Sequence, residues 1–541
     1  MRSQLKGIFF LVLILLAAAA WKIWLLSRGA FPFNADEAVV ALMARHILEG
    51  ARPTFFYGQA YMGSLDAFLV AAGFSWFGQN VWVVRLVQLL LYLAIIITTV
   101  GIGKVAFGSV KIGLIAALFL AIPTVNSTLY TTVSLGGYGE AMLLGSLNLL
   151  TGFWILKHIK SHSQERFKLL GMFLSWGVVV GLGLWANGLT LVFSAPMGIA
   201  ILVMLIGNRR TTPGYWKVAL SAVPGFLLGS LPWWLFAFQN GFQTLVVELF
   251  GSAVAVEQQS WILKILIHIE NFGLLGLPAA LGLRPPWTIE WLALPLIPFI
   301  MLFWGLVFYF LFRNVFRHED GDWTYPVLGG VIFVFILAFL LTPFGADPSG
   351  RYFLPLSIPL NLAAAGFLVS KVERRSFQIS LVGLVMVFNV WGTLQCAAVI
   401  PPGISTQFDS VTVIDQQKMP DLINYLRENG ETRGYSNYWV AYPLAFLSDE
   451  NLVFVPRLPY HEDLRFTLRD DRYPAYDNLV AGSQRVAYIT TNNPALDKFL
   501  RSAFSKLGIT WEEKQIGDFH IYYKLSKAVR PEELNLDAGS K

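Results

Sequence analysis

The chain has 541 residues, of which 55% belong to the hydrophobic set and only 14% are charged. Soluble globular domains average roughly 45–50% apolar and 25% charged residues. A water-soluble fold cannot bury this much apolar surface while keeping so few charges outside, so the composition excludes a cytosolic protein and predicts several membrane-spanning helices.

The distribution of charge divides the chain into two parts. Residues 1–400 carry 24 Lys/Arg and 15 Asp/Glu, whereas residues 401–541 carry 16 and 19. We therefore predict a transmembrane domain over 1–400 and a water-facing domain over 401–541. The basic balance belongs to loops at a membrane surface, so membrane lipids and no nucleic acid are the expected partners. The single cysteine, Cys396, can form no internal disulfide.

The membrane part contains eleven apolar windows long enough to cross about 30 Å of hydrocarbon. They lie near residues 7–26, 82–103, 111–125, 140–156, 169–186, 188–206, 217–237, 291–312, 324–343, 351–370 and 376–397. We interpret the first as an uncleaved anchor, because the membrane part continues beyond it. Residues 262–283 are also apolar but contain Lys264, His268 and Glu270, and we interpret them as a helix lying on the outer surface.

Basic residues in the short connections predict the orientation of the chain. With a cytoplasmic N-terminus, the inner loops receive Arg2, Lys6, Lys104, Lys111, Lys157, Lys160, Arg166, Lys168, Arg209, Arg210, Lys217, Arg313, Arg317, Lys371, Arg374 and Arg375. The outer loops hold most of the acids, among them Asp36, Glu37, Glu49, Asp66, Glu248, Glu257, Glu290 and Asp347. The protein is thus predicted to be a multi-pass protein of the cell membrane.

Eleven spans place residues 401–541 outside the cytoplasm. Helix-like runs at 418–429 and 494–507 and strand-like runs at 452–455, 485–491 and 519–525 predict a small α/β fold there. The expected fold class is an α-helical polytopic membrane protein with a small extracytoplasmic α/β domain.

The first outer loop, residues 27–81, is the most informative segment, since loops this long usually carry function. Asn34 and Glu37 have the spacing of a capping box, which predicts a helix from there to about Glu49, with Gly50 past its end. Its apolar positions predict a stripe facing the membrane: Val39, Val40, Leu42, Met43, Ile47 and Leu48. Glu37 has a structural task in the cap, whereas Asp36 is either a favourable charge at the helix start or a catalytic carboxylate.

These features together resemble the integral-membrane glycosyltransferases of the GT-C fold, and more closely the protein mannosyltransferase and aminoarabinose transferase group. The resemblance rests on the short anchor, the Asp36-Glu37 pair early in the first outer loop, the surface helix, the aromatic stretch 55–61, the many spans and the outer domain. It covers residues 1 to about 400. Where that group often has His-Pro-Pro-Leu, this chain has Tyr57-Gly58-Gln59-Ala60-Tyr61-Met62-Gly63-Ser64-Leu65, which leaves the subfamily and the sugar open.

The resemblance implies transfer of a sugar from a polyprenyl-phosphate carrier to a glycan, lipid or protein acceptor in the cell envelope, with Asp36 as base and Glu37 beside it. A sugar phosphodiester already has a good leaving group, so a base at the acceptor and a cation at the phosphate are the useful groups. A single displacement of this kind inverts the anomeric centre.

Arg351, in Asp347-Pro-Ser-Gly-Arg-Tyr, is the preferred phosphate ligand, although pairing with Asp347 or contact with headgroups would also explain it. The other substrate-binding candidates are Tyr352, Tyr57, Gln59, Tyr61, Arg284, His268 and Glu140.

No cofactor is implied with certainty. Asp320-Gly-Asp322 matches a metal-binding DxD pattern but falls in a cytoplasmic loop, and the histidines show no metal-ligand spacing. A divalent metal shared by Asp36, Glu37 and distant groups stays open. The alternative functions are a transporter or lipid flippase, which charges within spans and inverted repeats would favour, and a non-catalytic membrane scaffold.

Overall fold

The computed structural model describes residues 2–161, 165–210, 214–243, 260–317, 321–461, 464 and 466–536. Asp320, Glu248 and Glu257, which the sequence analysis singled out, lie outside these residues. The chain divides into two compact units. The helical unit comprises Met1–Arg28, Tyr61–Leu65 and Arg85–Cys396, and the mixed unit comprises Gly29–Ala60, Asp66–Val84 and Ala397–Lys541.

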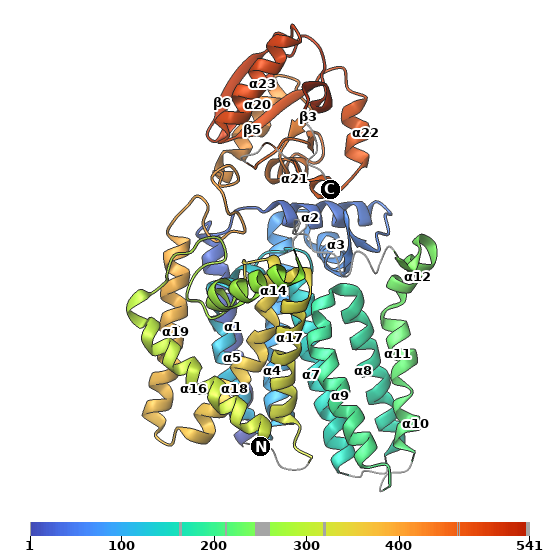
Figure 1. The fold of residues 1–541 in the computed structure, drawn as a ribbon, viewed down its shortest axis with the longest axis vertical. Helices are drawn as coiled ribbons and strands as arrows, with labels where there is room; N and C mark the ends of the chain where they lie inside the picture. Colours follow the sequence, from blue (N-terminus) through green and yellow to red (C-terminus); the bar gives the residue numbers. More distant parts are fainter. Residues whose placement is uncertain are drawn as a thin grey trace. The chain divides into compact units, whose positions relative to one another are not determined.

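The helical unit is a bundle of apolar helices, most of which are long (Figure 1). They are α1 (Arg2–Ser27), α4 (Val81–Ala106), α5 (Val110–Ala121), α6 (Val125–Tyr130), α7 (Tyr138–Lys160), α8 (Arg166–Ala186), α9 (Leu191–Gly207), α10 (Tyr215–Ala219), α11 (Ala222–Gly229), α12 (Leu231–Asn240), α14 (Trp261–Glu270), α15 (Leu277–Ala280), α16 (Ile297–Phe316), α17 (Thr324–Leu341), α18 (Ser357–Lys371) and α19 (Arg375–Ala397). Within the described residues, ten helical stretches are long and apolar enough to cross a membrane, or eleven if one pair bent by 60° is a single span. The predicted polytopic helical fold class is confirmed.

One predicted span is interrupted, and the apolar segment near 262–283 is long enough to be a span itself. The window near 111–125 is broken, because α5 has 12 residues and ends at Ala121, with Ile122 as its C-cap just before Pro123. At 1.5 Å per residue, that helix is too short to cross the hydrocarbon alone. The segment Trp261–Ala280 passes the length and composition test for a span. In Figure 1, α14 runs across the direction of the bundle helices, and its predicted place on the outer surface stays a prediction.

Glycines determine how closely α8 and α11 pack. Each helix has two glycines four residues apart: Gly177 and Gly181 on α8, and Gly225 and Gly229 on α11. A Cβ added at any of the four would lie 2.2–2.3 Å from a backbone carbonyl oxygen of the facing helix. Only glycine permits this approach, which is a common means of helix association in membranes.

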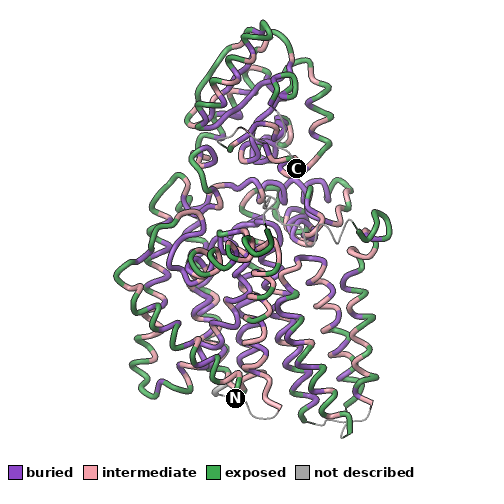
Figure 2. The backbone as a smooth tube through the Cα atoms, viewed as in Figure 1, coloured by how far each residue is buried: buried purple, intermediate pink, exposed green. Residues whose placement is uncertain are grey.

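The surface of the bundle is apolar on its outer helices. Large hydrophobic side chains of α16 are exposed, among them Phe299, Met301, Leu302, Phe312 and Phe316, and the tube of α16 and α19 is mostly green or pink in Figure 2. Exposed apolar side chains on long helices are what a surface in contact with lipid requires.

The mixed unit contains a five-stranded sheet with the order β4-β3-β5-β7-β6. Its strands are β3 (Arg433–Ser436), β4 (Val453–Pro456), β5 (Ala487–Thr491), β6 (Glu512–Ile516) and β7 (Phe519–Tyr523). β3 is parallel to β4 and β5, whereas β7 is antiparallel to β5 and β6. The predicted strands near 452–455, 485–491 and 519–525 therefore exist, and β3 and β6 are additions to them.

Alternating side chains allow helices to cover both faces of this sheet. On one face, Ile489, Phe519 and Ile521 share a core with leucines of α20 (Met419–Glu428) and α21 (Tyr438–Leu447). On the other, Phe504 of α23 (Pro494–Lys506) packs against Tyr488 and Tyr522. The predicted helices at 418–429 and 494–507 are α20 and α23. The remaining helix, α22 (Ala475–Ala481), packs on β3 and β4.

The first loop contributes α2 (Ala35–Leu48), the short strands β1 (Phe55–Phe56) and β2 (Gln59–Gly63), and α3 (Leu65–Phe77). The predicted boundaries of α2 are confirmed within two residues. Its predicted membrane-facing stripe is wrong, because five of the six apolar positions are buried in protein and only Leu48 is exposed. Within the mixed unit, α2 packs against α21.

Candidate functional site

The start of α2 fixes the position of Asp36. Asn34 caps the helix in an extended conformation, and its side-chain oxygen accepts a hydrogen bond of 2.8 Å from the backbone N–H of Asp36. The amide nitrogen of Asn34 donates to Thr406 Oγ1 at 2.7 Å. The two adjacent acids differ in environment, since Asp36 is half-buried whereas Glu37 is completely buried. Of the two, Asp36 is the one that a substrate can reach.

The side chain of Asp36 has a partner that sequence reasoning missed. The hydroxyl of Tyr438, the first residue of α21, donates a hydrogen bond to Asp36 Oδ1. Burial, together with the negative charge of Asp36, holds the pKa of Tyr438 well above its usual range. Tyr438 therefore remains a neutral hydrogen-bond donor at any physiological pH.

A cation and a further acid surround this pair. The Arg472 guanidinium lies over the Tyr438 ring at 5.3 Å and over the Phe56 ring at 5.9 Å. The Arg472 backbone N–H donates to the hydroxyl of Tyr442 at 2.6 Å. Burial raises the pKa of Asp470 to about 6, against the opposing effect of Arg472. The described surroundings of Asp36 are thus aromatic and largely buried, and they include the positive charge of Arg472.

The opposite end of α2 is held by a separate cluster of polar side chains. His46 Nε2 and the Tyr476 hydroxyl both bind Glu450 Oε1, at 3.0 and 2.7 Å. Burial would raise the pKa of Glu450, but these hydrogen bonds and Arg45 outweigh it, so that the pKa is lowered and the carboxylate is ionised. Arg45 also pairs with Asp449 at 3.0 Å.

Two predicted substrate residues, Tyr57 and Gln59, belong to the mixed unit. Tyr57 stacks on Tyr473 with ring centres 4.8 Å apart and bonds His46 Nδ1 through its hydroxyl at 3.0 Å. Since His46 is ten residues beyond Asp36, Tyr57 lies about 15 Å along the helix from the acid. Gln59 is buried. A pocket of about 450 Å³ opens beside this stack, lined by His46, Glu49, Ala51, Glu450, Tyr473, Ala475, Tyr476 and Leu479.

The helical unit holds the predicted phosphate ligand. Arg351 follows Gly350, whose φ of +83° is in the left-handed region that favours glycine, and begins a 3-10 turn, η5 (Arg351–Leu356). Its guanidinium forms an ion pair of 2.5 Å with Asp347 and lies 4.9 Å from the Tyr352 ring centre. The Arg351 side chain is 27% exposed, and within the described residues its Nε has no hydrogen-bond partner. Arg351 thus keeps donor capacity beside its ion pair.

Tyrosines surround this arginine. Tyr130 and Tyr138 are near enough to its guanidinium to interact with it electrostatically. Tyr61 interacts with Tyr138 in the same way. The structure therefore brings together three predicted residues, Arg351, Tyr352 and Tyr61. Glu140 is buried in the first turn of α7. Tyr130 and Tyr138 were missed because sequence gives no sign that α6 and α7 pack against η5.

Two other candidates are engaged in holding the fold. The Arg284 guanidinium binds the backbone carbonyls of Leu275, Pro285, Pro286, Thr288 and Pro348. His268 bonds the Leu340 carbonyl at 2.9 Å through Nδ1 and is buried. These contacts give both residues a structural role, and their predicted contact with substrate stays a prediction.

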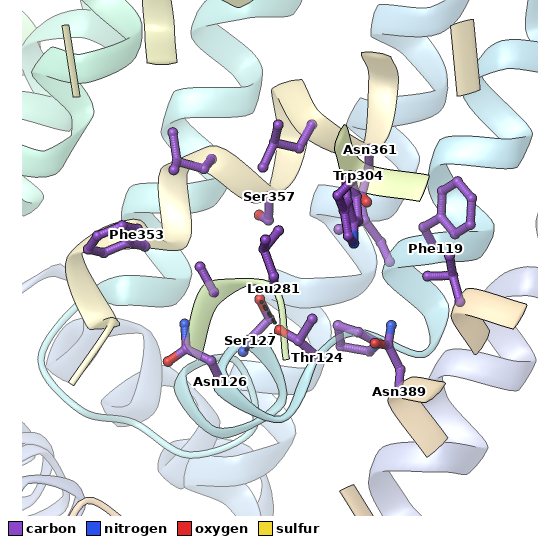
Figure 3. Close-up of a pocket in the computed structure, with 16 residues that line it drawn as sticks. Phe119, Thr124, Asn126, Ser127, Leu281, Trp304, Phe353, Ser357, Asn361 and Asn389 are labelled. Atoms are coloured by element: carbon purple, nitrogen blue, oxygen red, sulfur yellow. Dashed lines mark hydrogen bonds between the residues drawn. The ribbon is translucent and has the colours of Figure 1, made fainter. Parts of the chain in front are cut away.

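A second cavity lies inside the helical unit (Figure 3). Its lining includes Asn126, Asn361, Asn389, Trp304 and Phe119, and no charged side chain. It offers about 40 Å³, which suits about three water molecules rather than a sugar. Asn126 connects it to the Arg351 turn, because its amide nitrogen donates to the Gly350 carbonyl at 3.1 Å.

The residues that the structure describes near Asp36 do not form an assembled set of metal ligands. Among the described residues, no group of three or more His, Cys, Asp or Glu side chains has the geometry to hold a metal ion. A divalent metal that Asp36 and Glu37 would share with distant groups stays a prediction.

Solved structures with 13% sequence identity or less match almost the whole chain. The aminoarabinose transferase ArnT from Cupriavidus metallidurans, in its apo state, covers 100% of both chains with a TM-score of 0.60 and 13% identity. The same protein bound to undecaprenyl phosphate covers 99% of both, with a TM-score of 0.59. AglB, the oligosaccharyltransferase of Archaeoglobus fulgidus, in complex with an inhibitory peptide and a dolichol-phosphate, matches 90% of this chain and 69% of its own, with a TM-score of 0.51 and 11% identity.

The chain has the GT-C fold. The predicted resemblance is confirmed at the level of the fold. No family model matches the sequence, and no curated protein matches it. The similarity to these proteins is therefore detected in the structure and not in the sequence.

The structural role of Arg284 within this GT-C fold is testable. Arg284→Lys keeps the charge but loses the planar set of donors, so the helical unit should unfold at a temperature lower by several degrees. Scanning fluorimetry of the purified chain measures this. Any loss of activity should match the loss of folded protein. Normal thermal stability together with a raised KM for the lipid donor would return Arg284 to the substrate site.

Proposed function

We propose that the chain is a membrane glycosyltransferase that moves a sugar from a polyprenyl-phosphate carrier to an acceptor at the outer face of the membrane. The observation that carries this proposal is the match over the full length of ArnT, a protein whose structure contains undecaprenyl phosphate. AglB, another of the matching structures, holds a dolichol-phosphate, which is a lipid of the same chemical class. The sugar could be a hexose or a pentose.

Asp36 is the proposed base. It is half-buried, and its backbone is fixed by the Asn34 cap. One of its carboxylate oxygens accepts the Tyr438 hydrogen bond, and the other takes the proton from the acceptor hydroxyl or amine as the new glycosidic bond forms. The bond from the sugar to the phosphate oxygen breaks at the same time. Attack from the side opposite the phosphate inverts the anomeric centre.

Arg351 is the proposed phosphate ligand. The phosphate leaves as a dianion, and a guanidinium binds phosphate oxygens through two parallel hydrogen bonds. Asp347 holds the guanidinium in place through one of its nitrogens, and the Nε of Arg351 keeps a proton to donate. The hydroxyls of Tyr138 and Tyr352, whose electrostatic interaction with the guanidinium places them near it, supply neutral donors beside it.

Transport without transfer is less well supported. A transporter uses charged side chains inside its spans, and Lys22 of α1 is a buried charge of that kind. Its amino group, however, donates to the Thr131 carbonyl and to the hydroxyls of Thr131 and Thr132, at 2.7–2.9 Å. An amino group that is bound by three acceptors holds α1 against the segment after α6. This structural role explains the buried lysine without an ion pathway.

The orientation belongs to the proposal as well. The N-terminus and the connections α9–α10 and α18–α19 lie at one end of the helical unit in Figure 1. These connections carry Arg209, Arg210, Lys371, Arg374 and Arg375, which the positive-inside rule places in the cytoplasm.

A cysteine at Gln484 tests this orientation. Gln484 is exposed, whereas the native Cys396 is buried and should react little. Gln484→Cys should therefore react with a membrane-impermeant thiol reagent in intact cells, and the parent chain is the control. Labelling that appears only after lysis would place residues 401–541 in the cytoplasm and contradict the orientation.

The base assignment is tested with two neighbouring substitutions. Asp36→Asn keeps the size of the side chain but removes the base, so release of undecaprenyl phosphate from undecaprenyl-phosphate hexoses and pentoses should fall by about 10² or more. The assay uses purified protein, a cell-envelope extract as acceptor, and mass spectrometry of the lipid. Glu37→Gln, at a buried position, should affect thermal stability more than turnover.

The opposite order of effects would transfer the role of base to Glu37. If both variants consume donor at the parental rate, the first loop is not catalytic and the proposed mechanism is wrong.

A further inference from the structure

The carboxylate of Asp36 has a partner that orients it, and what this means for catalysis rests on the proposed function. The Tyr438 hydroxyl donates to Oδ1. Among the described residues, no other side chain bonds the Asp36 carboxylate. Tyr438 therefore fixes Oδ1, and Oδ2 has no side-chain partner among the described residues. A carboxylate that is fixed through one oxygen can present the other to the acceptor in a defined orientation.

The tyrosine is itself rigidly placed. It is buried, follows β3 by two residues, and begins α21. Its ring is edge-on to Trp439 and to Tyr442, with ring centres 5.4 Å away in each case. The Arg472 guanidinium lies on its face. Because these contacts come from several directions, the hydroxyl has little freedom to leave the carboxylate.

Arg472 is in turn fixed by the fold. Its backbone N–H binds the Tyr442 hydroxyl, which itself donates to the Asp470 carbonyl at 3.1 Å. On the first-loop side, Gly58 has a φ of +71°, and a Cβ there would meet Arg472 at 3.0 Å. The glycine turn between β1 and β2 thus leaves room for this arginine beside Tyr438.

We propose that Tyr438 is a positioning residue for catalysis, which holds the Asp36 carboxylate in the orientation that accepts the proton, with Arg472 supporting its ring. Residues of the 401–541 region would then contribute to catalysis through Asp36, and not only to packing. Tyr438 does not exchange a proton with substrate, because its burial and the nearby carboxylate oppose its ionisation.

The test is a double-mutant cycle on the full-length purified chain. Tyr438→Phe keeps the ring and removes only the hydroxyl. The kcat for release of undecaprenyl phosphate should fall about 10- to 100-fold, with KM for the lipid donor changed less than about threefold. In the Asp36→Asn background, Tyr438→Phe should cause no further loss, because the carboxylate that it orients is already gone.

Tyr476→Phe is the matched control. It also removes a buried tyrosine hydroxyl from a carboxylate, here Glu450, at the far end of α2. We expect Tyr476→Phe to lower the melting temperature as much as Tyr438→Phe does, while its kcat stays close to that of the parent chain. This result would show that loss of a buried hydrogen bond is not sufficient to lower kcat. The control therefore separates positioning from general destabilisation.

Three results would contradict the inference. Tyr438→Phe with kcat within twofold of the parent, while Asp36→Asn is inactive, would remove Tyr438 from catalysis and leave the proposed function standing. Losses from Tyr438→Phe and Asp36→Asn that multiply would show that the two act independently. An active Asp36→Asn variant would instead overturn the base assignment and the inference with it.

Discussion

The packing of α2 against α21 is the interaction on which the proposed catalytic arrangement depends. α2 carries three buried polar or charged residues, Glu37, Arg45 and His46, and burial of such groups is costly unless they are paired. The end of α21 and the turn after it supply partners, because Arg45 binds the Phe446 carbonyl and Asp449, and His46 binds Glu450. The same packing brings Tyr438 to Asp36. The first loop and the C-terminal residues consequently form one compact unit.

Local features of this arrangement could be predicted from the sequence, whereas its long-range features could not. The spacing from Asn34 to Glu37 predicts where α2 begins, since capping is determined by neighbouring residues. The Tyr438–Asp36 contact joins residues 402 positions apart. No periodicity or spacing reports such a contact. The stripe on α2 was assigned to the membrane for the same reason, because its true neighbours lie far along the chain.

The membrane part shows the same limit. Hydropathy locates the long helices, but it does not show that α14 runs across the direction of the bundle (Figure 1), nor does it reveal the break after α5. Arg351 and Arg284 look alike in sequence, as single arginines in loops that are predicted to be outer loops. The structure separates them, because Arg284 is engaged by five backbone carbonyls and Arg351 retains a donor without a partner among the described residues.

Native mass spectrometry of the purified chain with undecaprenyl phosphate and with uncharged undecaprenol measures whether the helical unit recognises a polyprenyl phosphate. The chain should bind the phosphate at least about 10-fold more tightly, a difference of about 1.4 kcal/mol. Arg351→Ala should abolish this preference while Asp36→Asn preserves it. Equal binding of the two lipids by the parent chain, or an unchanged preference in Arg351→Ala, would contradict the account.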